Sequence, residues 1–408
     1  MYKKYLNKKN YSVQLIFLLL IASFSSQYMT FVIFLLYIFI HLIKNNFCIK
    51  YKHFPGEKAY FTIFLLLFIV GVLYLGKIEW SFIRDAIRYI YIFIYWEICN
   101  LIAYKCKYNK NYIIKSVIFY CGIYCTFNLL VKFYYVLTNI NGENLFYIFT
   151  SRGRIDEFTL AIGLYLLIFK PFDDKDTTYI SKKIDAIFRW IMVLALILSF
   201  SRTTFLILVF FILFSYRHRL KLIIKYGMIT VSIIILVSYF IPTVYNVFLE
   251  KVLSSFTEIS SNYNEWNEYL ITNNWRGYEV YCAKQQFSNY SILNKIFGVG
   301  FGTGIDVGKY SYMVTQEDLV PYLHNGYYTM LIKGGLVGML LNIYFYLAML
   351  LDCTKLTDKK YRNFWISMVL SIIITTVGIN GILWGGCELI VLMLLRMCMI
   401  DDTIPLLN

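Results

Sequence analysis

The chain has 408 residues, of which 59% are hydrophobic and only 15% are charged, and its formal net charge is +15. Soluble domains carry roughly 25% charged residues, so the composition excludes an ordinary soluble protein and indicates an integral membrane protein. The positive charge is gathered in gaps between apolar runs, as membrane topology requires, and for that reason no nucleic-acid partner is expected.

Apolar runs alternate with short polar breaks along the whole chain. Each run is expected to be helical, because a lone strand cannot satisfy its backbone hydrogen bonds in lipid. Several runs are shorter than the ~20 residues that a bilayer core requires, so their ends are approximate. The predicted fold class is an all-α, polytopic membrane helix bundle of about twelve spans. The expected spans are 11–26, 28–44, 59–76, 81–104, 112–137, 156–170, 186–200, 203–216, 226–242, 326–351, 363–380 and 383–400.

Lysine and arginine are concentrated in every second gap between these spans. Because basic residues favour the cytoplasmic side, the alternation predicts a multi-pass protein with both termini cytoplasmic. The expected division is 1–242 for the first nine spans, 243–325 for a long extracytoplasmic loop, and 326–408 for the last three spans. Loops of this length without a functional reason are uncommon.

The candidate base lies where this loop meets the next span. His324-Asn325 ends the polar stretch, and imidazole suits general-base chemistry near neutral pH. The alternative is an interfacial histidine that caps the helix or binds lipid. Asn325 is expected to be the helix N-cap or a hydrogen-bonding group for substrate. The acidic pair Glu317 and Asp318, a few residues upstream, is the fallback base.

Arginines on the outer side are unexpected, because basic residues favour the cytoplasmic side of a membrane protein. Arginine presents a planar fork of donors that pairs bidentately with phosphate. Arg202 is flanked by apolar runs, and a charge at that depth is costly unless it is paired. The alternatives are snorkelling to lipid phosphates and ordinary loop charge. The candidates are Arg152 and Arg154 before span six, Arg202 in the turn after span seven, and Arg276 in the long loop.

Two further features have structural explanations. The glycine-rich run 297–304 lacks the Gly-Lys-Ser/Thr of a nucleotide loop, so a tight turn that shapes the loop is expected. Charged residues within the spans are explained by an ion-pair network between helices at least as well as by function. These residues are Arg84, Asp85, Arg88, Glu97, Lys333 and Glu388.

These motifs resemble the family of O-antigen ligases and O-antigen or capsule repeat-unit polymerases. Its members carry a His-Asn, His-Ser or His-Gln pair, nine residues, and then Gly-x-x-Gly after a long outer loop. His324-Asn325 with Gly335 and Gly338 fits that spacing, and the glycines are expected to allow close helix packing. Arg202 after Ser201 resembles the family's Ser-Arg turn. The likeness covers roughly residues 150–340, while the first 150 residues match only as apolar spans.

The resemblance implies an inverting, metal-independent glycosyltransferase of GT-C-type architecture that needs no cofactor. Its donor would be an undecaprenyl-diphosphate-linked oligosaccharide. His324 would take the proton from the attacking sugar hydroxyl, and the polar, aromatic loop would hold sugars. Arginines would offset the charge that develops on the diphosphate. Those arginines are Arg152, Arg154, Arg202 and Arg276.

Two activities share this apparatus. A polymerase joins a lipid-linked chain to a lipid-linked repeat unit of O-antigen or capsule, whereas a ligase transfers the chain to lipid A-core. Polymerase is favoured, because the motifs match loosely and the Lys/Ile/Asn/Tyr-rich composition resembles polysaccharide-locus genes. A flippase or transporter, with charged residues at the membrane midplane, is a further alternative. The expected setting is the bacterial inner membrane, with the bilayer, a chain-length regulator and a flippase as partners.

Overall fold

The computed structural model describes residues 2–44, 53–105, 109–138, 157–170, 180–199, 201–216, 228, 239, 266–313, 319–378 and 387–399. The side chains of residues 2–12 and of Arg202 lie outside this description. In the described residues every regular element is a helix, and the one isolated β-bridge joins Ile305 and Val320.

The expected all-α class is confirmed for the part of the chain that the structure describes. Its first half forms α1 (Tyr2–Phe24), α2 (Gln27–Lys44), α3 (Glu57–Leu75), α4 (Trp80–Lys105), α5 (Lys110–Thr138), α7 (Glu157–Phe169), α8 (Lys182–Ser199) and α9 (Arg202–Tyr216). The second half forms α12 (Glu268–Asn273), α13 (Trp275–Ser288), α14 (Ile292–Phe297), the 3-10 turn η2 (Gly308–Met313), α15 (Gly326–Leu351), η3 (Asp352–Lys355), α16 (Lys359–Thr375) and α17 (Cys387–Cys398).

Five described helices are long and apolar enough to cross a membrane, and three shorter apolar helices accompany them. Eleven of the expected spans coincide with helices, whereas 226–242 lies almost entirely outside the described residues. The count of twelve spans and the GT-C-type architecture stay predictions. The five long helices are Gln27–Lys44, Glu57–Leu75, Trp80–Lys105, Lys110–Thr138 and Gly326–Lys355.

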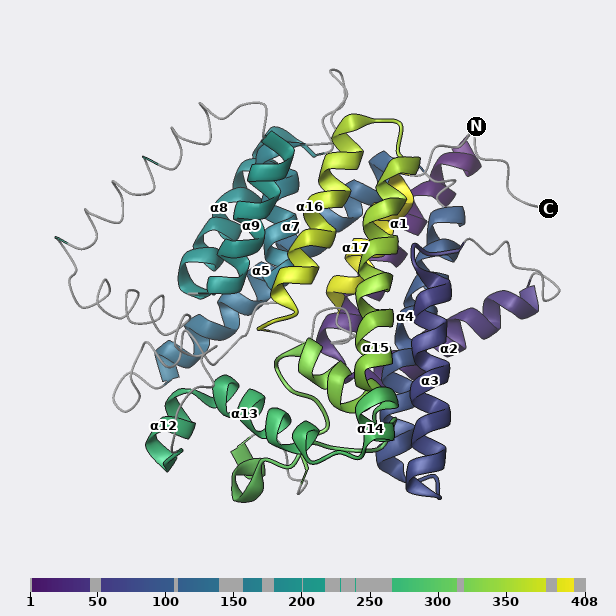
Figure 1. Cartoon of the computed structure of the whole chain (residues 1–408). Helices are drawn as coiled ribbons and strands as arrows, with labels where there is room; N and C mark the ends of the chain where they lie inside the picture. Colours follow the sequence, from purple (N-terminus) through teal and green to yellow (C-terminus); the bar gives the residue numbers. More distant parts are fainter. Residues whose placement is uncertain are drawn as a thin grey trace.

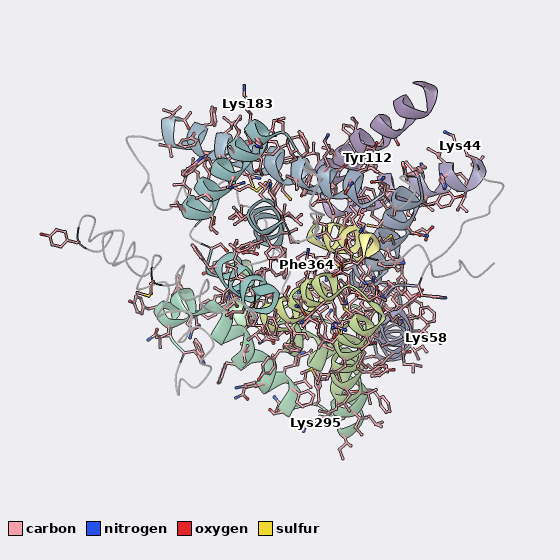
Figure 2. The ribbon with its side chains drawn as sticks, turned by 90° about the horizontal axis from the view of Figure 1, so that it is seen from above. Lys44, Lys58, Tyr112, Lys183, Lys295 and Phe364 are labelled. Carbon is pink, nitrogen blue, oxygen red and sulfur yellow. The ribbon has the colours of Figure 1, made fainter. Side chains whose placement is uncertain are left out.

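The long helices form one bundle, and α12–α14 gather at one end of it, which we call the loop end (Figure 1). The start of α15 lies at the loop end, and the start of α1 lies at the other (Figure 1). Viewed along the bundle, Phe364 lies inside it, whereas Lys44, Lys58 and Lys183 lie at its rim (Figure 2). Phe364 is fully buried and stacks on Tyr165, with ring centroids 5.1 Å apart.

The helix α15 is interrupted at Gly335, whose φ of 62° and ψ of −161° are not helical. A break in a helix leaves backbone groups without intrahelical partners, and in lipid these must find partners within the protein. The carbonyl of Lys333 accepts hydrogen bonds from the backbone N–H groups of Val299 (3.1 Å) and Gly300 (2.8 Å). The glycine-rich run therefore supplies the donors that the broken helix lacks.

This run lies between α3 and α15. The backbone N–H of Phe301 donates to the carbonyl of Leu67 at 3.0 Å, and its ring is fully buried against Tyr89 and Phe82. A Cβ on Gly300 would lie 2.0 Å from the backbone nitrogen of Gly71, so the two chains touch backbone to backbone. The expected tight turn in the glycine-rich run is present, and its contacts also attach the loop to the helix bundle.

Gly335 and Gly338 differ in what approaches them. A Cβ on Gly335 would lie 2.5 Å from the backbone nitrogen of Gly298 and from the carbonyl oxygen of Ile296. The close approach at Gly335 is thus to the end of helix α14, at Ile296 and the capping residue Gly298. A Cβ on Gly338 would meet Met330 Sδ at an ordinary 3.4 Å.

A buried ion pair holds the same region. Lys333 Nζ donates to Asp85 Oδ2, and both side chains are fully buried. Asp85 Oδ2 also accepts from the N–H of Gly302 at 3.0 Å, and Oδ1 accepts from the hydroxyl of Tyr322 at 2.8 Å. The expected ion pair between helices is confirmed for Asp85 and Lys333. Glu97 makes no ion pair within the described residues, and the side chain of Glu388 lies outside them.

We expect Gly335→Ala to destabilise the protein, because alanine would be held at a positive φ and its Cβ would collide with backbone. The free energy of unfolding should fall by more than about 1 kcal/mol. Gly338→Ala is the matched control, since its Cβ fits. Thermal unfolding of both variants in detergent measures the difference, and equal melting temperatures would contradict the role given to Gly335.

Candidate functional site

His324 lies in a short segment that bridges two helices at the loop end. The hydroxyl of Tyr322 bonds to Asp85 of α4, and the N–H of Gly326 donates to the carbonyl of Thr376, just after α16, at 2.9 Å. The five residues 322–326 are therefore tied to α4 at one end and to α16 at the other. His324 is the middle residue of this segment.

Asn325 fixes where α15 begins. Its Oδ1 accepts hydrogen bonds from the N–H groups of Tyr327 (3.1 Å) and Tyr328 (3.2 Å), so the expected N-cap is confirmed. The hydroxyl of Thr329 accepts from the N–H of Leu323 at 3.0 Å and donates to the carbonyl of Asn325 at 3.2 Å. The backbone on both sides of His324 is thus anchored by side chains of the first turn of α15.

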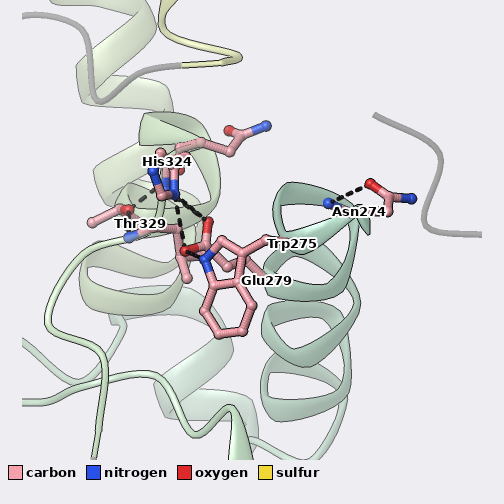
Figure 3. Close-up of polar contacts among 8 residues, drawn as sticks. Asn274, Trp275, Glu279, His324 and Thr329 are labelled. Atoms are coloured by element: carbon pink, nitrogen blue, oxygen red, sulfur yellow. Dashed lines mark hydrogen bonds and ion pairs between the residues drawn. The ribbon is translucent and has the colours of Figure 1, made fainter. Parts of the chain in front are cut away.

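Glu279 of α13 is the residue that orients the imidazole. It is fully buried, and its carboxylate accepts from Trp275 Nε1 at 2.6 Å and from the backbone N–H of His324 at 2.9 Å. His324 Nδ1 lies 3.0 Å from both carboxylate oxygens (Figure 3). The carboxylate therefore holds both the main chain and the ring of His324.

This contact assigns the two nitrogens of the imidazole. A neutral imidazole carries one donor and one acceptor nitrogen, and an ionised carboxylate only accepts. Nδ1 of His324 therefore donates to Glu279, and Nε2 keeps its lone pair. The side chain of His324 is 32% exposed while that of Glu279 is 0% exposed. The partly exposed imidazole of His324 can therefore accept a proton, and the negative charge of Glu279 is buried behind it.

The position of Glu279 depends on how α13 is held. Asn274 caps the helix by accepting from the N–H of Gly277 at 3.2 Å. Gln286 donates to the carbonyl of Gly304 at 3.2 Å and accepts from the N–H of Asp306 at 3.2 Å. A small apolar core also joins α13 to the segment that follows the glycine-rich run. Its buried members are Cys282, Ala283, Val299, Ile305, Val307, Val320, Leu323 and Ile332.

Arg276 comes to the same end of the bundle as His324. Its Nη1 lies 3.9 Å from the position that a Cβ on Gly378 would occupy, and Gly378 directly follows α16. The segment of His324 is bonded to Thr376, two residues before Gly378. Arg276 of α13 and the segment that contains His324 therefore both meet the chain just after α16.

Arg202 is placed only by its backbone. Ser201 Oγ accepts from the N–H of Thr204 at 3.2 Å, as a helix cap does, so Arg202 opens α9. Phe211, near the end of α9, contacts Phe364, near the start of α16, with ring centroids 5.7 Å apart. The contact packs α9 against α16.

Four other sequence candidates lie outside the described residues. Arg152, Arg154, Glu317 and Asp318 therefore stay predictions. Sequence reasoning missed Glu279, although it stands one helical turn after Trp275 and Arg276. The sequence signal that could have identified it was an acidic residue one helical turn after these two residues, on a helix within the loop.

Aromatic rings cluster around α13. Tyr278 lies between Trp266 and Tyr310, with ring centroids 5.3 Å and 5.8 Å away, and Tyr281 lies beside them. Burial raises the pKa of the Cys282 thiol to about 11, so this residue stays a thiol at neutral pH and is no nucleophile. The ring contacts show that these aromatic side chains pack on one another beside α13.

A comparison with known protein families agrees with this geometry. The model of the family described as O-antigen ligase matches residues 187–343, which is less than half of the chain. The matched segment includes Arg202, Arg276, Glu279, His324 and Gly335. No curated protein matches the chain significantly. Over residues 187–343 the chain is therefore similar to the family described as O-antigen ligase.

Proposed function

We propose that the protein is a polymerase of cell-surface polysaccharide repeat units. It transfers a glycan from undecaprenyl diphosphate to a sugar hydroxyl of a lipid-linked acceptor unit. The observation that carries this proposal is the pair of His324 and Glu279, which forms an oriented base at the end of a membrane bundle. The family match supports a glycosyltransferase of the O-antigen pathway.

In the proposed reaction, the acceptor hydroxyl approaches the anomeric carbon of the donor sugar. His324 Nε2 takes the hydroxyl proton while the new C–O bond forms and the bond from C1 to the diphosphate oxygen breaks. The leaving diphosphate keeps the bonding electrons. Because the hydroxyl attacks C1 from the face opposite the leaving group, the configuration at C1 inverts. Glu279 stabilises the imidazolium that results, as the carboxylate does in His–carboxylate pairs. The reaction as written requires no metal.

Arginines are proposed to stabilise the leaving group. Charge that develops on a diphosphate is stabilised by fixed cations in a site of low dielectric constant. Arg276 is the best-placed candidate, because it stands on the same helix as Glu279, which holds the base. Arg202 opens α9, and we propose it for the same role together with Arg152 and Arg154, which are proposed from sequence alone.

The proposed orientation puts the loop end outside the bacterial inner membrane. The ends of the long helices opposite the loop end carry Lys58, Lys105, Lys110 and Lys355, which favour the cytoplasm. Both termini would then be cytoplasmic in a protein of about twelve spans. The oriented base would face lipid-linked sugars at the outer surface.

A ligase is the second candidate, because the matching family model carries that description. It would use the same base and arginines and differ in its acceptor, lipid A-core. A polymerase takes a second lipid-linked repeat unit instead. Chain-length regulators and flippases act on the same lipid-linked material, and we propose them as partners in either case.

Loss of the gene is expected to leave single repeat units on the lipid carrier or on core and to remove long chains. Gel analysis of surface polysaccharide and extracted carrier lipid checks this, with a plasmid-borne copy as the control. Long polymer accumulating on the carrier would instead indicate a ligase. Repeat units trapped on the cytoplasmic leaflet would indicate a flippase.

His324→Ala is expected to lower turnover by about 100- to 10,000-fold, the range of general-base assistance. Glu279→Gln keeps the shape of the side chain but removes the charge that faces the imidazolium, so it should also lower turnover strongly. Trp275→Phe removes only the indole donor and should have the smallest effect. Turnover is measured with purified protein and a defined lipid-diphosphate oligosaccharide.

Each variant must still insert and bind the donor, which separates lost chemistry from lost folding. Near wild-type turnover in His324→Ala would show that the base assignment is wrong. If Glu317→Gln or Asp318→Asn is inactive while His324→Ala is active, the upstream carboxylate is the base.

A further inference from the structure

One cation at the loop end has no role in the proposed mechanism. Arg88 lies on α4, one helical turn after Arg84, and its guanidinium carbon is 3.9 Å from the ring centroid of Tyr322. Its side chain is partly exposed, and within the described residues it forms no ion pair. Tyr322 is only two residues before the candidate base His324.

The nearby carboxylate of Asp85 is already engaged. Its two oxygens accept hydrogen bonds from Lys333, from the hydroxyl of Tyr322 and from the N–H of Gly302. The charges of Asp85 and Lys333 offset each other in the interior. Arg84, whose Nε lies 3.6 Å from Asp85 Oδ1, and Arg88 therefore leave a net positive charge at this cluster.

The way Arg88 contacts Tyr322 leaves its hydrogen-bond donors usable. A guanidinium that stacks on a ring uses its flat face, whereas its N–H donors lie in the plane and point away from its edges. The ring itself is held in place, since the hydroxyl of Tyr322 donates to Asp85 at 2.8 Å. The planar fork of a guanidinium matches the paired oxygens of a phosphate.

The position of Arg88 relative to the base suggests which phosphate it binds. The segment 322–326 is tied to α4 at Tyr322, beside Arg88, and to α16 at Gly326. Arg276 lies at the α16 side, against Gly378. The guanidinium groups of Arg88 and Arg276 thus lie toward opposite ends of the segment 322–326, whose middle residue is His324.

We propose that Arg88 binds the phosphate of the lipid-linked acceptor, while Arg276 binds that of the donor. The donor diphosphate is bonded to the reacting carbon, so its cation should lie on the helix that orients the base, and Arg276 shares α13 with Glu279. The acceptor phosphate lies at the far end of its sugars, which suits a separate cation on α4. This inference rests on the polymerase activity proposed above and adds a second anion site to it.

Binding of undecaprenyl diphosphate to the purified full-length protein tests the site without any transfer reaction. Native mass spectrometry should find two molecules bound per wild-type chain at saturation and one per Arg88→Gln chain. Arg362→Gln, at the opposite end of the bundle, is the matched control and should bind two. One molecule on the wild type, or two on Arg88→Gln, would overturn the proposal.

Two further experiments test whether the second molecule is bulk phospholipid and whether the loss of binding in Arg88→Gln reflects misfolding. If phosphatidylglycerol displaces the second molecule at equal concentration, Arg88 holds bulk phospholipid and the proposal fails. If Arg88→Gln does not fold, Arg88→Lys keeps the charge without the fork and should weaken the second binding step about tenfold. Unchanged affinity of that step in Arg88→Lys would also overturn the proposal.

Transfer kinetics then separate this inference from the polymerase activity. The acceptor oligosaccharide is offered on undecaprenyl diphosphate and, in parallel, as an alkyl glycoside without phosphate. Arg88→Gln should raise KM about tenfold for the first acceptor and leave KM for the second unchanged. An equal loss with both acceptors would mark a purely structural residue. A wild type that binds two molecules but transfers to neither acceptor would refute the polymerase and not the second site.

Discussion

The buried ion pair of Asp85 and Lys333 is the interaction on which the rest of this arrangement depends. It joins α4 to α15 at the point where α15 is about to break at Gly335. The same carboxylate holds Gly302 of the glycine-rich run and Tyr322 of the segment that leads to His324. Removing one partner of a buried pair typically costs about 3–5 kcal/mol, because it leaves an uncompensated charge in the interior.

The path from this ion pair to the candidate base is continuous. The break at Gly335 leaves the carbonyl of Lys333 free to accept from the glycine-rich run, which brings that run between α3 and α15. The residues that follow the run pack against α13, and α13 carries Glu279. The base is therefore positioned by a polar loop that is anchored inside an apolar bundle, so a membrane protein can hold a rigid site at its surface.

Much of this could be predicted from the sequence. Apolar runs and lysine-rich gaps gave the helices, and the polar-to-apolar change at His324-Asn325 gave the start of α15 and its cap. Glu279 was missed because its partner His324 is distant along the chain, and a contact of this kind has no periodicity. The spacing of Gly335 and Gly338 was visible, but only the structure shows that Gly335 breaks α15 and meets the end of α14.

A double-mutant cycle between Asp85 and Lys333 tests the central claim most directly. Thermal unfolding is measured for Asp85→Asn, Lys333→Met and the double variant. Each single variant should be strongly destabilised, and the double variant should recover much of that loss, because neither residue of the pair is then left as a buried charge without the other. Losses that add to within about 0.5 kcal/mol would mean that the two residues do not interact, and would contradict the account.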